Sequence, residues 1–379
     1  MSMAIIDARE WQNIFDLRTG AKIEADSPVV NIVRGIQGHH PYPGDTDPGS
    51  NKWVSDVALD IIEKYQPQLV FLAYAGQYFT NRYTPMTGDE RAEMFSAVFS
   101  EVNRFIAESG FTPIIIGTGN MTDFKDFIDV SKLDGLAVST HWSARYAGLH
   151  NPSVSDLKYL EKHPKIERIV GRNELLGLFG ASPAEAARVP EYLVLAKEGY
   201  TFKTASGTLR KALMIPANGF RIPVFCPGGN PNEITDIRGI VDAGLKKDRV
   251  AVIILEGIGM GNFPWQNTSC INGRDWYYYE PGEAQYLTIM TGEHRVFDYP
   301  TGYKYFEEDQ ETKEYPFSGY FTSLPEGTLA SQFSGKSIAV GNKSMFMHMV
   351  TGADLSIECF ARNLYNQGTM GVVHRQDKL

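Results

Sequence analysis

The sequence predicts an α/β fold with a mostly parallel sheet and helices on both of its faces. Short continuous apolar runs alternate with longer stretches whose apolar residues recur at helical spacing. The clearest run is 250–255, VAVIIL, which has the character of a strand buried on both faces of a parallel sheet. Glu256 and Gly257 follow this strand, and such strand ends are where open α/β sheets place ligand groups. The alternative is a core strand followed by a surface carboxylate.

Composition excludes several classes of protein. The 379 residues contain 43% hydrophobic and 21% charged residues, as in globular proteins, and a single α/β domain over 1–379 is expected. A formal charge of -9 and scattered basic residues argue against a nucleic-acid partner. No apolar run reaches membrane-spanning length, and the first residues lack the apolar core of a signal peptide. An odd number of cysteines without CxxC spacing indicates reduced thiols, so a cytoplasmic location is expected; these are Cys226, Cys270 and Cys359.

The first half of the sequence is expected to contain four strands and two helices. Thr87 and Glu90 form a capping box that opens a helix, and Gly110 ends that helix. His141 lies just past a strand end, where a lone histidine is more often structural than catalytic. In order, strands are expected at 29–33, 69–74, 112–116 and 136–139, and helices at 53–65 and from 87 to 110.

The second half continues the alternation. A charged and aromatic stretch at about 297–325 is expected to form an insertion or exposed loop. The expected strands are 166–170, 192–196, 212–215, 223–226, 250–255, 337–340 and 371–374, and the expected helices are 155–161, 233–243 and 354–367.

A Gly/Pro-rich loop at 35–50 is long enough to suggest a site. It contains His39, His40 and Asp45, whose side chains are possible metal ligands. Adjacent histidines rarely chelate one ion together, and no HxH or HxxxH spacing is present. A solvated loop therefore remains the simpler interpretation.

Common nucleotide and hydrolase motifs are missing. The sequence has no GxxxxGK[ST] phosphate loop, no HExxH and no GxSxG. GIGMGNF has glycines spaced as GxGxG, and Glu256 before them would point a negative charge at a pyrophosphate. Dinucleotide binding at this loop is therefore not expected.

Several segments taken together resemble the alkaline phosphatase superfamily, in particular its nucleotide pyrophosphatase/phosphodiesterase and cofactor-independent phosphoglycerate mutase branches. VIILEG is similar to the strand that ends in Asp-Gly in that family, with Glu256 at the aspartate position. The other similar segments are GEAQYLTIMTGEHR, FLAYAGQYF, IIIGTGNMT and PGGNPNEITDIRGIVDAGL. The resemblance covers about two thirds of the chain and implies an alkaline-phosphatase-like sheet with 250–255 at its centre, between the strands that start near Leu69 and Pro113.

Two departures from the family affect what the resemblance implies. The segments appear in a different order, as in a circular permutation with its junction near 246–249. Nearly every ligand of the family's two-metal site is also missing, and only Glu256 could still coordinate a metal well. The resemblance therefore implies a diverged protein that binds a small polar ligand at the C-terminal strand ends. The ligand-binding residues expected there are Tyr74, Gln77, Thr118, Asn120, Asn230, Glu256 and Glu283.

Two alternatives remain open from the sequence. One is a phosphate-ester hydrolase with a rebuilt site that holds a divalent metal such as zinc or manganese. Its metal ligands would come from His39, His40, Asp45, His141 and His294. The other is an unrelated α/β enzyme.

Overall fold

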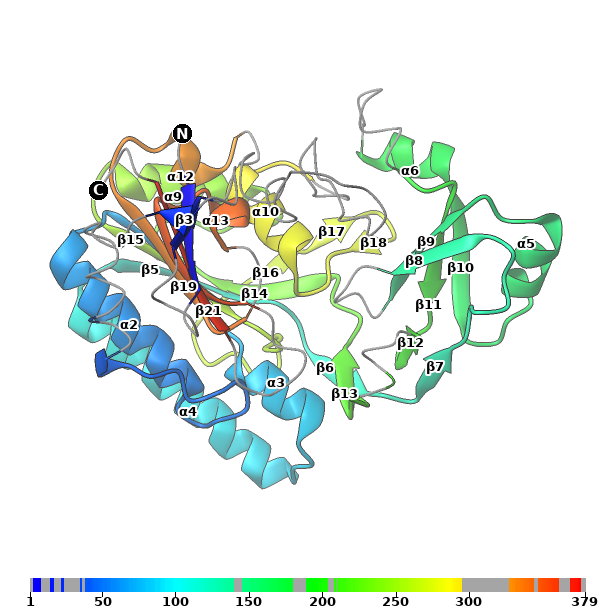
Figure 1. Ribbon diagram of the computed structural model, residues 1–379, viewed down its shortest axis with the longest axis horizontal. Helices are drawn as coiled ribbons and strands as arrows, with labels where there is room; N and C mark the ends of the chain where they lie inside the picture. Colours follow the sequence, from blue (N-terminus) through cyan, green and yellow to red (C-terminus); the bar gives the residue numbers. More distant parts are fainter. Residues whose placement is uncertain are drawn as a thin grey trace.

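The computed structural model describes residues 3–7, 14–16, 22–23, 35, 38–139, 145–179, 189–203, 208, 210–294, 327–343, 347–360 and 369–375. The expected strand at 29–33, the expected insertion at 297–325 and His141 lie outside these residues. The described chain forms a larger lobe around one broad sheet and a smaller lobe on the right of Figure 1.

The larger lobe is built on an 11-stranded sheet in the order β16-β14-β5-β15-β4-β19-β20-β21-β1-β2-β3. Five adjacent strands run parallel to one another: β5 (Thr112–Gly117), β15 (Val250–Leu255), β4 (Leu69–Tyr74), β19 (Ser337–Gly341) and β20 (Leu355–Phe360). The remaining pairings are antiparallel, and they involve β16 (Thr268–Ile271), β14 (Arg221–Phe225), β21 (Thr369–Arg375), β1 (Met3–Asp7), β2 (Ile14–Asp16) and β3 (Lys22–Ile23). The sheet is therefore mixed, and the parallel part expected from the sequence is its centre.

Strand β15 lies between β4 and β5, as expected. Val250 pairs with Leu69 on one side and with Thr112 on the other, and this register continues to Leu255. All six residues of β15 are buried, because helices cover both faces of the sheet. The prediction of a central, doubly covered strand from the run VAVIIL is confirmed.

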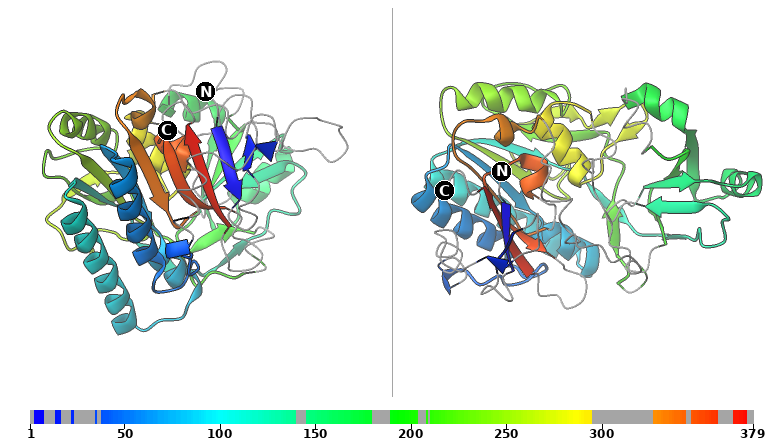
Figure 2. Two further views of the ribbon diagram at one scale, coloured as in Figure 1. Left: turned by 60° about the vertical axis from the view of Figure 1, so that its left-hand side comes forward. Right: turned by 45° about the horizontal axis from the view of Figure 1, so that its top comes forward.

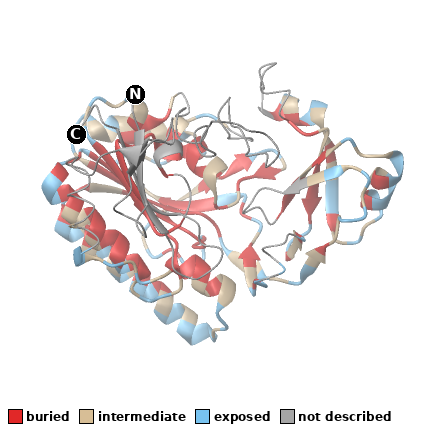
Figure 3. Cartoon of the chain, in the orientation of Figure 1, coloured by how far each residue is buried: buried red, intermediate tan, exposed pale blue. Residues whose placement is uncertain are grey.

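Alternate residues of the central strands enter two separate cores. Val70 and Leu72 of β4 pack beneath α2 (Ser50–Tyr65) and α4 (Gly88–Ser109). Phe71 and Ala73 pack on the opposite face. That face is covered by α9 (Asp236–Leu245), α10 (Glu283–Thr291), α12 (Leu329–Gln332) and α13 (Met347–Thr351). Figure 3 shows the buried sheet between helices with exposed outer faces.

Local sequence signals predict the two ends of α4 correctly, but they predict a helix where the structure has strand β20 (Leu355–Phe360). Thr87 and Glu90 form the expected capping box of α4, and Gly110 caps its other end with φ 66°. The prediction of a helix from 354 is wrong over the described residues, because Leu355–Phe360 is strand β20. Leu355 and Ile357 enter the core at strand spacing, and parallel pairing with β19 outweighs the helical pattern.

The smaller lobe is a four-stranded antiparallel sheet in the order β10-β11-β9-β8, inserted in the chain between β5 and β14. Two short strand pairs, β6–β13 and β7–β12, lie where the chain enters and leaves it. It has its own apolar core, which includes Ile128, Leu149 and Leu160. The right-hand view of Figure 2 shows this small sheet apart from the larger one. Its elements are β6 (Met121–Asp123), β7 (Asp126–Ile128), β8 (Leu136–Ser139), β9 (Tyr146–His150), α5 (Val154–Glu161), β10 (Ile166–Gly171), α6 (Arg172–Phe179), β11 (Tyr192–Ala196), β12 (Tyr200–Phe202) and β13 (Met214–Pro216).

The two lobes meet at a short hairpin of the larger lobe, β17 (Gly273–Arg274) and β18 (Tyr277–Tyr278). Tyr146 of β9 stacks on Tyr277 at 4.9 Å between ring centroids and donates its hydroxyl to the Tyr278 carbonyl oxygen at 2.9 Å. The guanidinium of Arg145 lies 4.6 Å from the Tyr278 ring centroid. Aromatic packing with a buried hydrogen bond therefore joins the lobes.

Candidate functional site

The candidate site lies at the C-terminal ends of the parallel strands β4, β15 and β19. Parallel strands end at one edge of a sheet, so the turns that follow them are brought together there. Glu256 follows β15, Gln77 lies in the first turn of α3 (Gly76–Tyr83) after β4, and Asn342 and Lys343 follow β19. All four side chains are almost completely buried.

A buried ion pair lies at the centre of the site. Lys343 Nζ lies 2.5 Å from Glu256 Oε2, and neither side chain is exposed. Tyr286 of α10 donates its hydroxyl to the other carboxylate oxygen, Oε1, at 2.8 Å. Both carboxylate oxygens of Glu256 therefore have a donor from the protein, and its charge is matched by the adjacent ammonium group.

The tyrosines around the ion pair stay protonated at neutral pH. Burial, followed by the charge and hydrogen bond of Glu256, raises the pKa of Tyr286 well above 10.0. Burial is also the largest cause that raises the pKa of Tyr78 to about 12. The ring of Tyr78 lies 4.6 Å from Lys343 Nζ, so its π face adds a second favourable contact for the cation.

Three amide side chains join the strand ends to one another. Gln77 donates from Nε2 to the carbonyl oxygens of Tyr74 at 2.7 Å and Glu256 at 2.8 Å. Asn51 donates from Nδ2 to Gln77 Oε1 at 2.9 Å. Asn342 accepts from the Ala75 backbone N–H at 2.7 Å and donates from Nδ2 to Ser50 at 2.7 Å. Because every bond is buried, the network fixes the position of the ion pair.

Two glycines allow the turn after β15 to approach its neighbours closely. Gly257 has φ 72°, and its backbone N–H donates to the hydroxyl of Thr118 at 3.0 Å. A Cβ atom at Gly259 would lie 2.3 Å from Asn120 Oδ1. These contacts explain the glycine spacing in this loop by packing, without a pyrophosphate.

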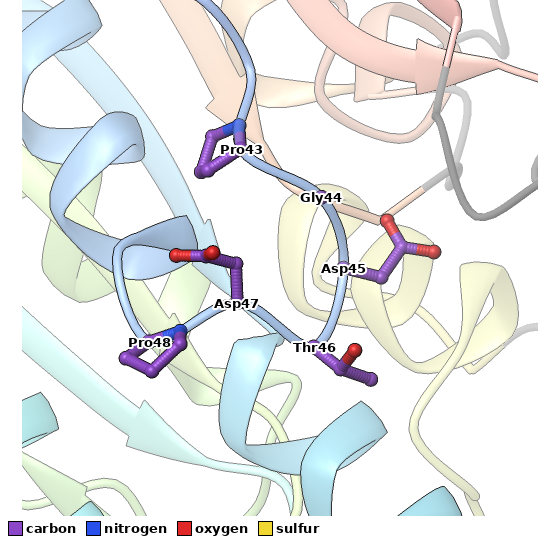
Figure 4. Close-up of a pocket in the computed structure, with 6 residues that line it drawn as sticks. All are labelled: Pro43, Gly44, Asp45, Thr46, Asp47 and Pro48. Carbon is purple, nitrogen blue, oxygen red and sulfur yellow. The ribbon is translucent and has the colours of Figure 1, made fainter.

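A pocket of about 310 Å³ adjoins the network in the Gly/Pro-rich loop. It is lined by Pro43, Gly44, Asp45, Thr46, Asp47 and Pro48 (Figure 4). Tyr42 donates its hydroxyl to Asp45 at 2.7 Å and to the Asn342 carbonyl oxygen at 3.5 Å. Ser50, which begins α2 directly after this loop, bonds to Asn342. The loop is thus attached to the strand-end network through Asn342.

The seven residues expected to bind a ligand do not all lie in the strand-end network. Gln77, Glu256 and Thr118 contact the strand-end network directly. Tyr74 contributes its carbonyl oxygen only, because its hydroxyl bonds to Ser55 at 2.8 Å in the core beneath α2. Glu283 is half-buried in the first turn of α10, one turn before Tyr286.

Asn120 and Asn230 lie away from the buried network. Asn120 is exposed beside Gly259. The expected position of Asn230 at the C-terminal strand ends is wrong, because β14 runs antiparallel to β5. The chain after β14 therefore leaves from the opposite edge, where exposed Asn230 accepts a hydrogen bond from Thr268 at 3.1 Å.

The described metal candidates do not converge on one site. His40 Nε2 lies 3.6 Å from Asp60, and exposed His39 contacts only the ring of His40 edge-on among the described ring pairs. His294 lies elsewhere, with Nδ1 3.3 Å from the Tyr279 hydroxyl and Nε2 3.9 Å from Glu233. Figure 4 shows the carboxylates of Asp45 and Asp47 pointing in different directions. Within the described ranges, no group of three or more histidine, cysteine, aspartate or glutamate side chains could hold a metal ion.

Sequence reasoning missed Lys343, Tyr286, Asn342 and Asn51. Lys343 and Asn342 directly follow a correctly expected strand, so the signal that pointed to Glu256 also applied to them. Tyr286 and Asn51 lie inside helices, where only the folded structure shows which residues face the strand ends.

No family model matches this chain, and no curated protein or solved structure shows significant similarity to it. In the described part of the chain, no helix combines the length and apolar character needed to cross a bilayer.

Proposed function

We propose that this chain binds a small polar ligand at the C-terminal edge of its central sheet, and that two-metal phosphate-ester chemistry is not its activity. The observation that carries this proposal is the buried pair of Glu256 and Lys343. The Lys343 ammonium group lies against Glu256 Oε2, where a cation coordinated by this carboxylate would bind. A divalent cation at Glu256 would have to displace Lys343, and the displaced charge would then be buried without its partner.

The rebuilt-site alternative receives less support from the same geometry. A two-metal hydrolase needs several carboxylates and imidazoles around its ions, together with a nucleophile. The Glu256 carboxylate is instead bonded by a lysine and a tyrosine, a second tyrosine lies on the lysine, and a neutral amide bonds to the Glu256 backbone. These groups hold one carboxylate in place but provide no second set of anionic ligands.

The pocket at 43–48 supplies the space for a ligand beside this network. A volume of about 310 Å³ is at the lower end of the range for small-molecule sites. Asp45, Thr46 and Asp47 contribute oxygen atoms to the lining, and Figure 4 shows the Asp47 carboxylate on the same side of the loop as the apolar rings of Pro43 and Pro48. Oxygen acceptors of this kind favour a ligand with hydroxyl or amine donors.

We also propose that the chain is a permuted, diverged relative of the alkaline phosphatase superfamily. The placement of β15 between β4 and β5 supports this kinship, because the resemblance requires that order. Replacement of the metal ligands by neutral side chains is consistent with loss of the family's chemistry.

A ligand screen on the full chain tests the binding proposal. Thermal unfolding would be followed against a panel of polyols, sugars, amines and amides. At least one of them should raise the melting temperature in a concentration-dependent way, since a ligand that binds the native state stabilises it. Asp45→Asn keeps an acceptor for Tyr42 but removes the charge, and should weaken the dissociation constant of an amine or hydroxyl ligand by about tenfold.

Asp89→Asn is the matched control, because Asp89 is an exposed aspartate in the first turn of α4. Its ligand affinity should equal that of the native chain. A panel in which no compound stabilises the chain, or equal binding by native and Asp45→Asn proteins, would contradict the proposal.

A further inference from the structure

Asparagine is followed directly by glycine at two places in this chain, at Asn218 before Gly219 and at Asn272 before Gly273. Glycine has no Cβ atom and adopts a wide range of backbone angles, so its nitrogen can reach the side-chain carbonyl carbon of the preceding asparagine. The two steps lie together near the junction of the lobes, where Asn272 donates from Nδ2 to the Gly219 carbonyl oxygen at 2.7 Å. Their surroundings differ in whether the side-chain amide is free to react.

The amide of Asn272 is held on all sides. The residue is fully buried, and Nδ2 donates to the carbonyl oxygens of Gly219 and Tyr279, each at 2.7 Å. Its Oδ1 accepts a hydrogen bond from Gln285 Nε2 at 2.8 Å. The nitrogen of this amide could leave only by breaking two buried hydrogen bonds, so the fold protects Asn272 from reaction.

The amide of Asn218 is exposed and is bonded through its oxygen alone. Oδ1 accepts from Arg145 Nη1 at 3.2 Å and from the Tyr278 hydroxyl. Among the described residues, no acceptor bonds to Asn218 Nδ2 or to the backbone N–H of Gly219. The attacking atom and the leaving group are therefore both unhindered by protein hydrogen bonds, while the oxygen has two donors.

The two donors on Asn218 Oδ1 suit the transition state of such an attack. When a nitrogen adds to the side-chain carbonyl carbon, negative charge develops on Oδ1, and donors already aimed at this oxygen stabilise that charge. The guanidinium of Arg145 is always charged. Burial raises the pKa of Tyr278 above its ordinary value, so its hydroxyl keeps the proton that it donates.

We propose that Asn218 is a modification site, at which the folded chain converts its own side-chain amide to a carboxylate. Solvent hydroxide removes the proton of the Gly219 nitrogen, which forms a bond to Cγ of Asn218. The Cγ–Nδ2 bond then breaks, and the amide nitrogen takes a proton from water and leaves as ammonia. Water opens the resulting succinimide ring at either carbonyl, which gives aspartate or isoaspartate at 218. Water is the only co-reactant, and nothing is oxidised or reduced.

The modification would change the junction of the lobes. Asn218 lies between β13 and β14, where the chain returns from the smaller lobe to the larger one. An aspartate at 218 would place a carboxylate against Arg145, and a charge-assisted hydrogen bond is stronger than one to an amide oxygen. Isoaspartate would instead add one atom to the backbone at this crossing. The inference is independent of the ligand proposed for the pocket at 43–48, because Asn218 does not line it.

Peptide mass spectrometry of the full chain tests the site, after incubation in ¹⁸O-labelled water and tryptic digestion in ordinary water. Trypsin releases Asn218 in the peptide 212–221 and Asn272 in the peptide 250–274. In the folded chain, residue 218 should gain the mass of a labelled carboxyl group in place of the amide, and residue 272 should not. In the chain unfolded with urea, both should react, because Asn272 is then exposed to water.

Two variants test the roles of the neighbouring groups. Tyr278→Phe keeps the ring but removes one donor, and should slow the reaction of Asn218 by about fivefold, the factor that one hydrogen bond supplies. Gly219→Ala should slow it by about fivefold, because a Cβ atom restricts the backbone angles open to the attacking nitrogen. A Cβ atom at Gly219 would meet its nearest neighbour at 3.7 Å, an ordinary contact, so this variant should fold.

Tyr159→Phe is the matched control, because Tyr159 is 47% exposed on α5 and its hydroxyl has no hydrogen-bond partner among the described residues. It should leave the rate at Asn218 unchanged. Circular dichroism would confirm that each variant folds, and Gly219→Ala provides the test if Tyr278→Phe does not. An unmodified Asn218 in the folded chain, equal reaction of Asn272 there, or a native rate in the folded Tyr278→Phe or Gly219→Ala variant would overturn the inference.

Discussion

At the scale of single residues, the structure depends on the match between Glu256 and Lys343. The two residues are 87 positions apart in the sequence and meet because β15 and β19 flank β4 in the sheet. Glu256 could be predicted because it directly follows an unmistakable buried strand. Lys343 could not be assigned as its partner, since the sequence does not show which strand ends are neighbours.

Removal of one member of this pair should destabilise the fold strongly. Lys343→Met or Glu256→Gln should each lower the free energy of unfolding by about 3–5 kcal/mol, because the remaining charge is buried without its partner. The double variant should lose less free energy of unfolding than the two single variants lose together. Urea unfolding, monitored by circular dichroism, measures the free energy of unfolding of the two single variants and of the double variant.

The exposed pair of Lys203 and Asp129 provides the control for this cycle, since each side chain is 46% exposed. Lys203→Met should change the free energy of unfolding by less than about 1 kcal/mol. Single losses at Glu256 and Lys343 as small as that would show that the buried pair does not hold the strand ends together.

The buried tyrosines predict a loss of stability at alkaline pH. In the folded chain the pKa of Tyr78 is raised from 10.0 to about 12, and the pKa of Tyr286 is raised further by burial beside Glu256. The folded state therefore holds these protons more tightly than the unfolded state. Stability should be constant with respect to these groups below pH 10 and fall as the pH rises from 10 through 12.

Tyrosine absorbance at 295 nm and circular dichroism would be recorded together across this pH range. The buried tyrosines should ionise in the same step in which the fold is lost. Complete ionisation of all tyrosines below pH 11 in a chain that remains folded would be inconsistent with the burial of Tyr78 and Tyr286.

At the scale of helices and strands, the sequence was most informative where one local signal dominated. The continuous apolar runs of β4 and β15 and the capping box of α4 predicted their elements correctly. Strand β20 was mistaken for a helix because its apolar residues fit both periods, and only pairing with β19 decides between them. Strand β14 was expected correctly, but its direction was not, so Asn230 was assigned to the wrong edge of the sheet.

At the scale of the whole molecule, the smaller lobe was the least predictable feature. Its strands β10 and β11 were expected near their observed positions, but nothing local indicates that they pair with β9 in a separate antiparallel sheet. The same limit applies to the candidate site. Its amide and ionic groups come from four separate parts of the chain, which the fold brings to one edge of the larger sheet.

Lys343, and not a metal ion, neutralises the carboxylate of Glu256 in this structure. The most direct measurement is elemental analysis of zinc and manganese in the full chain purified without chelator, together with turnover of p-nitrophenyl phosphate and its phosphodiester. We expect less than about 0.1 transition-metal ion per chain and no turnover above background, since the buried ammonium group of Lys343 already pairs with the carboxylate. One or two metal ions per chain, with turnover that is lost in Glu256→Gln, would contradict it.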